Sequence, residues 1–191
     1  VAHLTGLLGR YGRQHPRPGA THFSASSGQH GVKWEQHTEF VTYTVFLAGL
    51  GERPFDPADF DVFPDDWLEA APGVRVTSAM IRICERPERD GDVNQLANDW
   101  LVTESMAVSC VLDDAMVVAG DFRIDQGGHL RFAVFPRGDV GERRVGRVVQ
   151  RLCEIETYKA LSMLGFTRVR AIAGRMTEID EELTRLMTAM T

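Results

Sequence analysis

The chain has 191 residues, a size that fits one domain or one domain with a helical extension. Hydrophobic residues make up 43% of it and charged residues 25%, which is typical of a globular protein with a sizeable core. The net charge of −6 argues against a nucleic-acid partner, because a protein that binds nucleic acid needs a basic surface. No apolar run reaches the roughly 18 residues of a membrane-spanning helix. The three cysteines form no CxxC pair, which indicates reduced, buried thiols.

The N-terminal quarter combines a short helix with the longest run of strand-forming residues. Apolar residues at helical spacing predict a helix over residues 1–11. A short strand is predicted over residues 21–25, and a long one over residues 32–47, where most residues are β-branched or aromatic. We expect these two strands to form a hairpin.

The middle of the chain predicts a loop followed by more strands. Residues 49–72 are rich in Asp, Glu and Pro, which predicts a solvated acidic loop with one short helix; a cation site is the alternative. A strand is predicted over residues 74–84 and a short helix over residues 93–101. Asp- and Gly-rich turns then connect the strands of a β-meander. These strands are 105–112, 115–124 and 129–135.

From Asp139 onward, the apolar spacing changes from 2 to about 3.5 residues, which predicts long helices. We expect a helix over residues 140–164, a kink or turn at Gly165–Phe166, and a second helix to the end. The first helix should pack on the sheet through Val145, Val148, Leu152 and Ile155. The second carries a heptad-like stripe, which predicts a homo-oligomer formed through these helices. The stripe consists of Ile172, Met176, Ile179, Leu183, Leu186 and Met190.

These elements predict an α+β fold with a mostly antiparallel sheet of about six strands, packed by helices. The alternative is a three-layer α/β/α arrangement with a mixed sheet. We expect residues 1–138 to form the sheet domain and residues 139–191 to form the helices. The first half of the helical part packs on the sheet, and the second half is a stalk or oligomerisation segment.

Three ionisable residues, Glu35, His37 and Glu39, share one face of the predicted strand over residues 32–47. Neighbours in this row are about 7 Å apart between Cα atoms. Imidazole and carboxylate groups at this spacing can hold a divalent metal ion or another small ligand, or act as an acid–base pair. We expect instead a structural ion cluster, in which arginines of adjacent elements contact Glu35 and Glu39, with the metal, ligand and acid–base roles as alternatives.

A second group, Arg143, Arg147 and Arg151, lines one face of the predicted first long helix. Positive charge near a helix N-terminus opposes the helix dipole, so these side chains need an acidic partner. That partner is an anion such as phosphate, an acidic surface of another subunit, or a carboxylate of the fold such as Asp121 or Asp125. The sequence contains no nucleophile elbow, Walker loop or GxGxxG motif, so no catalytic residue and no organic cofactor is predicted.

Three motifs, KWEQHTEF, DFRID and VQRLCEIETY, occur together in this chain. With them, the chain resembles a family of uncharacterised bacterial proteins, a domain of unknown function whose members are described as membrane-anchored. No activity is established for that family, so the resemblance assigns no functional residue. It implies that members extend further at both ends, with an apolar hairpin near the C-terminus. This chain would then lie at the cytoplasmic face of the inner membrane and reach the membrane through segments that it lacks.

The resemblance therefore implies the cytoplasmic part of a membrane-anchored protein that acts as a regulatory, ligand-sensing or assembly module. Its layout is similar to that of CorA-type divalent-cation transporters, which makes a transporter domain with a divalent-ion site the first alternative. A metal-assisted hydrolase that uses Glu35, His37 and Glu39 is the second alternative.

Overall fold

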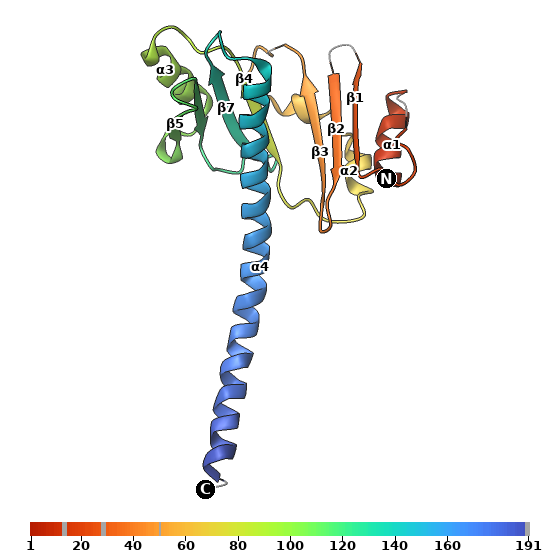
Figure 1. Cartoon of the computed structure of the whole chain (residues 1–191), viewed down its shortest axis with the longest axis vertical. Coiled ribbons are helices and arrows are strands. Elements are labelled where there is room, and N and C mark those ends of the chain that lie inside the picture. The colour runs from red at the N-terminus through yellow and green to blue at the C-terminus, as the bar shows by residue number, and fades with distance from the viewer. Residues whose placement is uncertain (13–14, 28–29, 50, 190–191) are drawn as a thin grey trace.

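The computed structural model of the chain describes residues 1–12, 15–27, 30–49 and 51–189. Within these residues, the chain forms two separate β-sheets and a C-terminal helix of 48 residues (Figure 1). The predicted α+β class is confirmed. The prediction of one sheet of about six strands is wrong, because the strands divide into a three-stranded and a four-stranded sheet.

The element bounds are as follows. The strands are β1 (His22–Ser27), β2 (His30–Gln36), β3 (Val41–Leu47), β4 (Ala79–Ile83), β5 (Ala107–Val111), β6 (Met116–Gly120) and β7 (Leu130–Pro136). The helical elements are α1 (Ala2–Arg10), η1 (Pro57–Phe60), α2 (Asp65–Glu69), α3 (Asp90–Trp100), η2 (Thr103–Ser105) and α4 (Glu142–Ala189).

The first sheet is an antiparallel meander in the order β1–β2–β3. The single long strand expected over residues 32–47 is in fact β2 and β3. The chain reverses between them, where the His37 amide donates a hydrogen bond to the Phe40 carbonyl at 2.9 Å, and Gln36 pairs with Val41. Helix α1 covers one face of this sheet, with Leu4 and Leu8 packed on Trp34.

The opposite face of the first sheet is mostly polar, as the two-residue alternation of a strand predicts. Each of its cross-strand rows contains one residue from each strand. One row, Ser26–Gly31–Phe46, contains an apolar ring, and the other two rows are polar: His22–Glu35–Thr42 and Ser24–Lys33–Thr44. We call the six residues of these two polar rows the polar face of the first sheet.

The second sheet has the strand order β4–β7–β6–β5, with β4 parallel to β7 and the other pairs antiparallel. The predicted meander is therefore confirmed as β5–β6–β7. The sheet is mixed, because the chain passes through α3, β5 and β6 before β7 returns beside β4. None of the three cysteines takes part in a disulfide, and Cys110 is exposed on the edge strand β5, where burial was expected.

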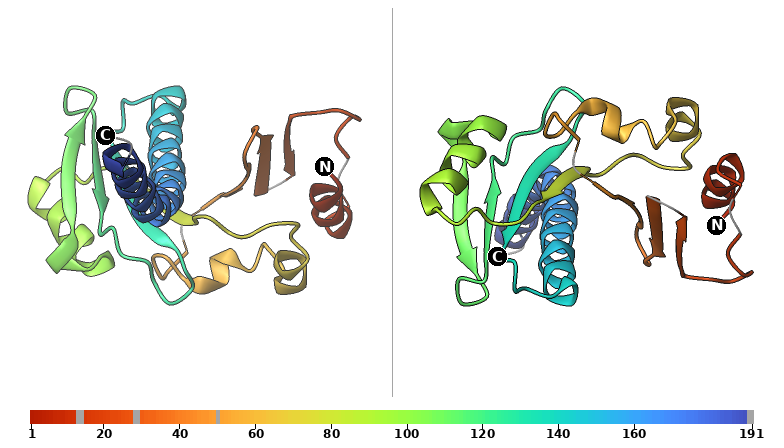
Figure 2. Two further views of the ribbon diagram at one scale, coloured as in Figure 1. Left: turned by 90° about the horizontal axis from the view of Figure 1, so that it is seen from below. Right: turned by 90° about the horizontal axis from the view of Figure 1, so that it is seen from above.

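The core of the second sheet lies between its strands and α3. Val93, Ala97 and Leu101 of the α3 region pack against a cluster of buried strand residues. These strand residues are Val117, Ala119, Ala133 and Phe135. Figure 2 shows α3 and α4 on opposite sides of this sheet. The first part of α4 thus covers the sheet face that α3 leaves open.

Helix α4 is continuous, and the predicted break at Gly165–Phe166 is absent. At 1.5 Å per residue, it is about 72 Å long. Its inner face is partly buried as far as Leu161, whereas every described residue from Ser162 to Ala189 is exposed. We call Ser162–Ala189 the stalk, which projects away from both sheets (Figure 1). Among the described residues, no helix is both long and apolar enough to cross a membrane.

Candidate functional site

Helix α4 contacts both sheets before the stalk begins. On one side, the Tyr158 ring lies edge-on to Phe40 of the β2–β3 turn, with 6.3 Å between the ring centroids. On the other side, the Lys159 ammonium lies 5.6 Å from the ring centroid of Phe122, which follows β6. The two sheets therefore meet at this helix, although no strand pairing joins them within the described part of the chain.

The inner face of α4 carries two ionisable side chains at this junction, Glu156 and Cys153. Glu156 is buried, with 3% of its surface exposed, and forms an ion pair with Lys159 one turn later. Burial raises the pKa of the Cys153 thiol, and the positive charge of Lys33 partly opposes this increase. Cys153 therefore lies close enough to the polar face of the first sheet to sense its charges. The raised pKa makes this thiol less reactive than an ordinary one.

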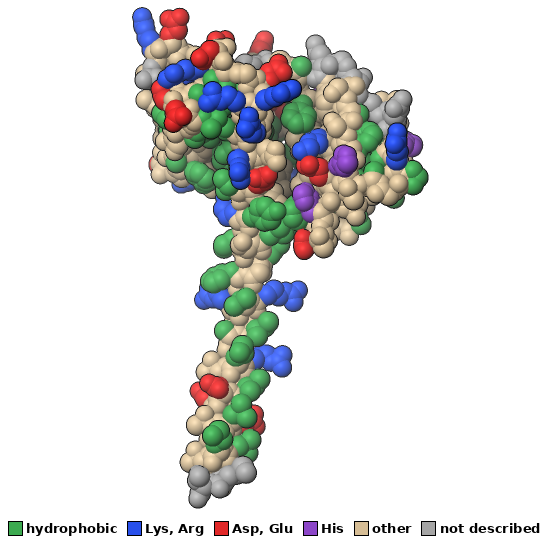
Figure 3. All heavy atoms as spheres, in the orientation of Figure 1, with side chains coloured by type: hydrophobic (Ala, Val, Ile, Leu, Met, Phe, Trp, Pro, Cys, Tyr) green, Lys and Arg blue, Asp and Glu red, His purple; other side chains and the backbone are tan. Residues whose placement is uncertain are grey.

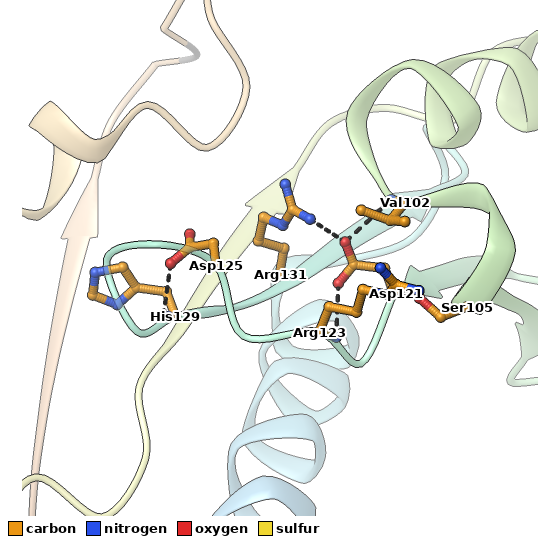
Figure 4. Close-up of polar contacts among 7 residues, drawn as sticks. All are labelled: Val102, Ser105, Asp121, Arg123, Asp125, His129 and Arg131. Carbon is orange, nitrogen blue, oxygen red and sulfur yellow. Dashed lines mark hydrogen bonds and ion pairs between the residues drawn. The ribbon is translucent and has the colours of Figure 1, made fainter.

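The segment Asp121–Asp125 connects the second sheet to this junction (Figure 4). Asp121 is fully buried, and its carboxylate accepts hydrogen bonds from the amides of Val102 and Arg123, both at 3.2 Å. The same carboxylate forms an ion pair with Arg131 of β7. The Arg123 side chain turns the other way and donates to Ser105 Oγ at 3.0 Å.

The strand predicted over residues 115–124 ends early for a structural reason. Strand β6 stops at Gly120, and Phe122 has a φ of +53°, a conformation that non-glycine residues rarely adopt. The backbone therefore turns at Phe122, which places its ring half-exposed next to α4. The carboxylate of Asp121 holds this turn by bonding to the backbone on its far side, at Arg123.

His129 lies at the other end of the same loop. Its Nδ1 shares a hydrogen bond with Ser78 Oγ at 2.8 Å, and its amide donates to the Asp125 carboxylate at 2.9 Å. Its ring packs on Phe60, with centroids 4.1 Å apart. Burial lowers the pKa of His129, while Asp125 works against this decrease.

The lowered pKa of His129 predicts a loss of stability in mild acid. Its ordinary value is 6.5, and the folded value lies below it. Between the two, the unfolded chain binds more protons, so stability is lost as the pH falls below about 6.5. Thermal unfolding followed from pH 7.5 to 5.5 measures this slope. His129→Gln should flatten it, and equal slopes in both proteins would contradict the prediction.

The predicted row of Glu35, His37 and Glu39 does not form on one strand. Glu35 lies on β2 and forms an ion pair with Lys33 at 2.8 Å rather than with an arginine. His37 and Glu39 lie in the β2–β3 turn, where the exposed His37 ring stacks on Phe40 at 4.3 Å. Among the described residues, no group of three or more His, Cys, Asp or Glu side chains is arranged to hold a metal ion. A role for the three residues in ligand binding stays a prediction.

The arginines of α4 point to solvent. Arg143 and Arg147 are exposed, and no ion pair joins either of them to another described residue. Arg151 reaches only Glu154, three residues later, at 3.7 Å. One of the internal partners considered for them, Asp121, forms its ion pair with Arg131 instead. Their expected role in binding an anion or an acidic surface remains a prediction.

The stalk carries the apolar stripe that the sequence predicts, and the stripe faces solvent. The five described members of the predicted stripe are each more than half exposed; Met190 lies outside the described residues. Along the stalk, green hydrophobic side chains alternate with charged ones (Figure 3).

The alternating spacing of three and four residues in the apolar stripe also continues toward the sheets. The stripe predicted from the sequence began only at Ile172. The additional positions are Ile155, Tyr158, Ser162, Gly165 and Val169. Ile155 belongs to this outer stripe: it is 59% exposed, and its predicted packing on the sheet is wrong.

The chain is thus an α+β protein with two sheets joined by one long helix that presents an exposed apolar stripe. It belongs to the family described as "Protein of unknown function (DUF3422)", whose model matches residues 1–191. No curated protein and no solved structure matches the chain.

Proposed function

We propose that this protein is an assembly module, in which the two sheets form a head and the stalk pairs with another helix. One observation carries this proposal: apolar side chains at heptad spacing remain exposed along a helix that its own chain does not cover. An isolated surface helix normally exposes polar residues on all sides or packs its apolar stripe. A heptad stripe is the pattern that a second helix covers by knobs-into-holes packing.

The energetics favour pairing only if most of the stripe takes part. Covering a half-exposed Ile, Leu or Met contributes about 1 kcal/mol. Two stalks with the five described side chains each would gain roughly 10 kcal/mol, which is comparable to the roughly 4–15 kcal/mol cost of association. Shortening the stripe should therefore abolish assembly rather than weaken it slightly.

The contacts at the junction support a regulatory role for the head within the same proposal. Phe40 and Phe122 come from different sheets and contact neighbouring residues of α4, Tyr158 and Lys159. A ligand that shifts either sheet would act directly on the helix that carries the stalk. Membrane attachment rests on the sequence resemblance alone and is a separate proposal, which the pairing of the stalks does not require.

The assembly function is tested by the mass of the protein in solution. We expect light scattering to give a dimer for the whole chain and a monomer for a chain ending at Leu164. Leu183→Asp in the stripe should also give a monomer, because it places a charge in the paired face. The matched control, Thr184→Asp, changes an exposed residue beside the stripe and should leave the dimer intact. A monomeric mass for the whole chain would refute the proposal.

A further inference from the structure

The charges of the stalk are separated along its length. The half nearer the head carries only positive charge, and the outer half is mainly negative. The positive residues are Arg168, Arg170 and Arg175, and the negative ones are Glu178, Asp180, Glu181 and Glu182, followed by Arg185. Blue side chains accordingly lie higher on the stalk than red ones in Figure 3. None of the three positive residues forms an ion pair with another described residue.

We propose that the stalk pairs in antiparallel orientation with the stalk of a second copy of this chain, an inference that rests on the assembly function proposed above. Antiparallel pairing places the positive half of each stalk beside the negative half of the other. Parallel pairing places the negative half of each stalk beside the negative half of the other. Like charges at neighbouring positions are destabilising, so the charge pattern selects the antiparallel arrangement.

The apolar stripe defines the register of this pair. When Met176 lies opposite Ile179 of the second copy, the successive layers contain an apolar residue from each helix. The layers are Met176 with Ile179, Ile172 with Leu183, and Val169 with Leu186, each formed twice by two-fold symmetry. A shift that places Leu183 opposite Gly165 also places Leu186 opposite Ser162, which leaves two large side chains without apolar partners.

The residues that flank this seam fit the same register. Arg175 comes directly before Met176, and Glu182 comes directly before Leu183. In antiparallel pairs, these flanking positions face their equivalents, so Arg175 lies beside Glu182 of the second copy, twice in the dimer. A parallel pair would bring Arg175 near Asp180 of the second copy instead, and would place Glu182 beside Met187.

The seam residues themselves also disfavour a parallel dimer. Parallel two-stranded coiled coils prefer β-branched residues at the first seam position of each heptad and Leu at the second. Here the first positions include Met176 and Leu183, and the second positions include Ile172 and Ile179. Of the six seam residues, only Val169 at a first position and Leu186 at a second position follow the parallel preference.

The head leaves room for the second helix. In the proposed register, Ala189 of the second copy reaches a point opposite Phe166. The last partly buried residue of α4 is Leu161, about 7 Å closer to the head at 1.5 Å per residue. The paired helices therefore overlap only where the stalk is exposed, and the two heads lie at opposite ends of the dimer.

Disulfide trapping tests the orientation in the whole chain. Chains with Val169→Cys are mixed with chains with Leu186→Cys, oxidised, and digested for mass analysis of the linked peptides. The antiparallel pair brings residue 169 opposite residue 186, within the roughly 7 Å between Cα atoms that a disulfide spans. It keeps residues 169 and 186 each about 26 Å from their own copies along the helix axis. We therefore expect mixed 169–186 links and no links between identical positions.

Each other outcome has a distinct meaning. Links between identical positions, 169–169 and 186–186, would overturn the antiparallel orientation while leaving assembly intact. A dimer by light scattering that gives neither kind of link would also overturn the inference, because another surface would then hold the dimer. A monomer in solution would refute the proposed function together with the inference.

Charge reversal provides a second, independent measurement by analytical ultracentrifugation. Arg175→Glu should weaken dimerisation about 3- to 10-fold, since it removes two flanking ion pairs and adds repulsion. Adding Glu182→Arg should restore the affinity in the antiparallel pair. Restoration by Asp180→Arg instead of Glu182→Arg would identify a parallel pair and overturn the inference.

Discussion

Asp121→Ala is expected to lower the free energy of unfolding by about 3 to 5 kcal/mol. The substitution leaves the largely buried guanidinium of Arg131 without its counter-charge. It also removes the acceptor for the amides of Val102 and Arg123, which hold the turn at Phe122. Denaturant unfolding of the purified variant measures the loss.

Two further variants separate the charge from the rest of the effect. Asp125→Ala, in the same loop, removes a single acceptor from the His129 amide, and we expect a loss of about 1 kcal/mol. A double variant, Asp121→Leu with Arg131→Met, removes both charges and should recover much of the stability lost in Asp121→Ala. If Asp121→Ala lost no more stability than Asp125→Ala, the ion pair would have no structural importance.

Trp34→Ala and Phe135→Ala are each expected to cost about 3 to 5 kcal/mol, but in different halves of the head. Both side chains are almost completely buried. Trp34 belongs to a cluster with Leu4 and Leu8, and Phe135 belongs to the cluster between the second sheet and α3. Because these clusters share no residue, each substitution should mainly loosen its own sheet.

Amide hydrogen exchange distinguishes the two sheets directly. In Trp34→Ala, protection should fall in β1–β3 and persist in β4–β7, and Phe135→Ala should give the opposite pattern. Tyr43→Phe serves as a mild control in the first cluster, since it retains the ring. An equal loss of protection in both sheets for either variant would show that the head unfolds as one cooperative unit, contrary to this expectation.

The local periodicity of the sequence predicts the elements better than their boundaries. The change to a period of about 3.5 residues correctly predicts the C-terminal helix, and β5–β6–β7 follow from Asp- and Gly-rich turns. The reversal at His37–Phe40 contains no Gly, Pro or Asn, so the residue pattern gives no turn signal there and predicts one continuous strand. One missed turn is enough to separate Glu35 from His37 and Glu39.

Long-range pairing explains the other differences. Strand β4 pairs in parallel with β7 after two intervening strands, and no local pattern encodes that contact. The Asp121–Arg131 ion pair depends on the backbone turn at Phe122, which has a positive φ that the residue type does not suggest. Gly165 does not end α4, because one glycine costs a helix only about 1 kcal/mol relative to alanine.

The absence of a break in α4 fixes how the heads are oriented about the axis of the assembly. A helix turns by about 100° with each residue, so the angle between the inner face at Glu156 and the seam at Val169 depends only on the number of residues between them. One inserted residue would rotate each head by about 100° around the stalk, whereas seven would nearly restore its direction. The number of residues in the continuous helix thus sets the angle between each head and the seam. A rotation of α4 at its contacts with the two sheets would rotate the apolar stripe of the stalk by the same angle.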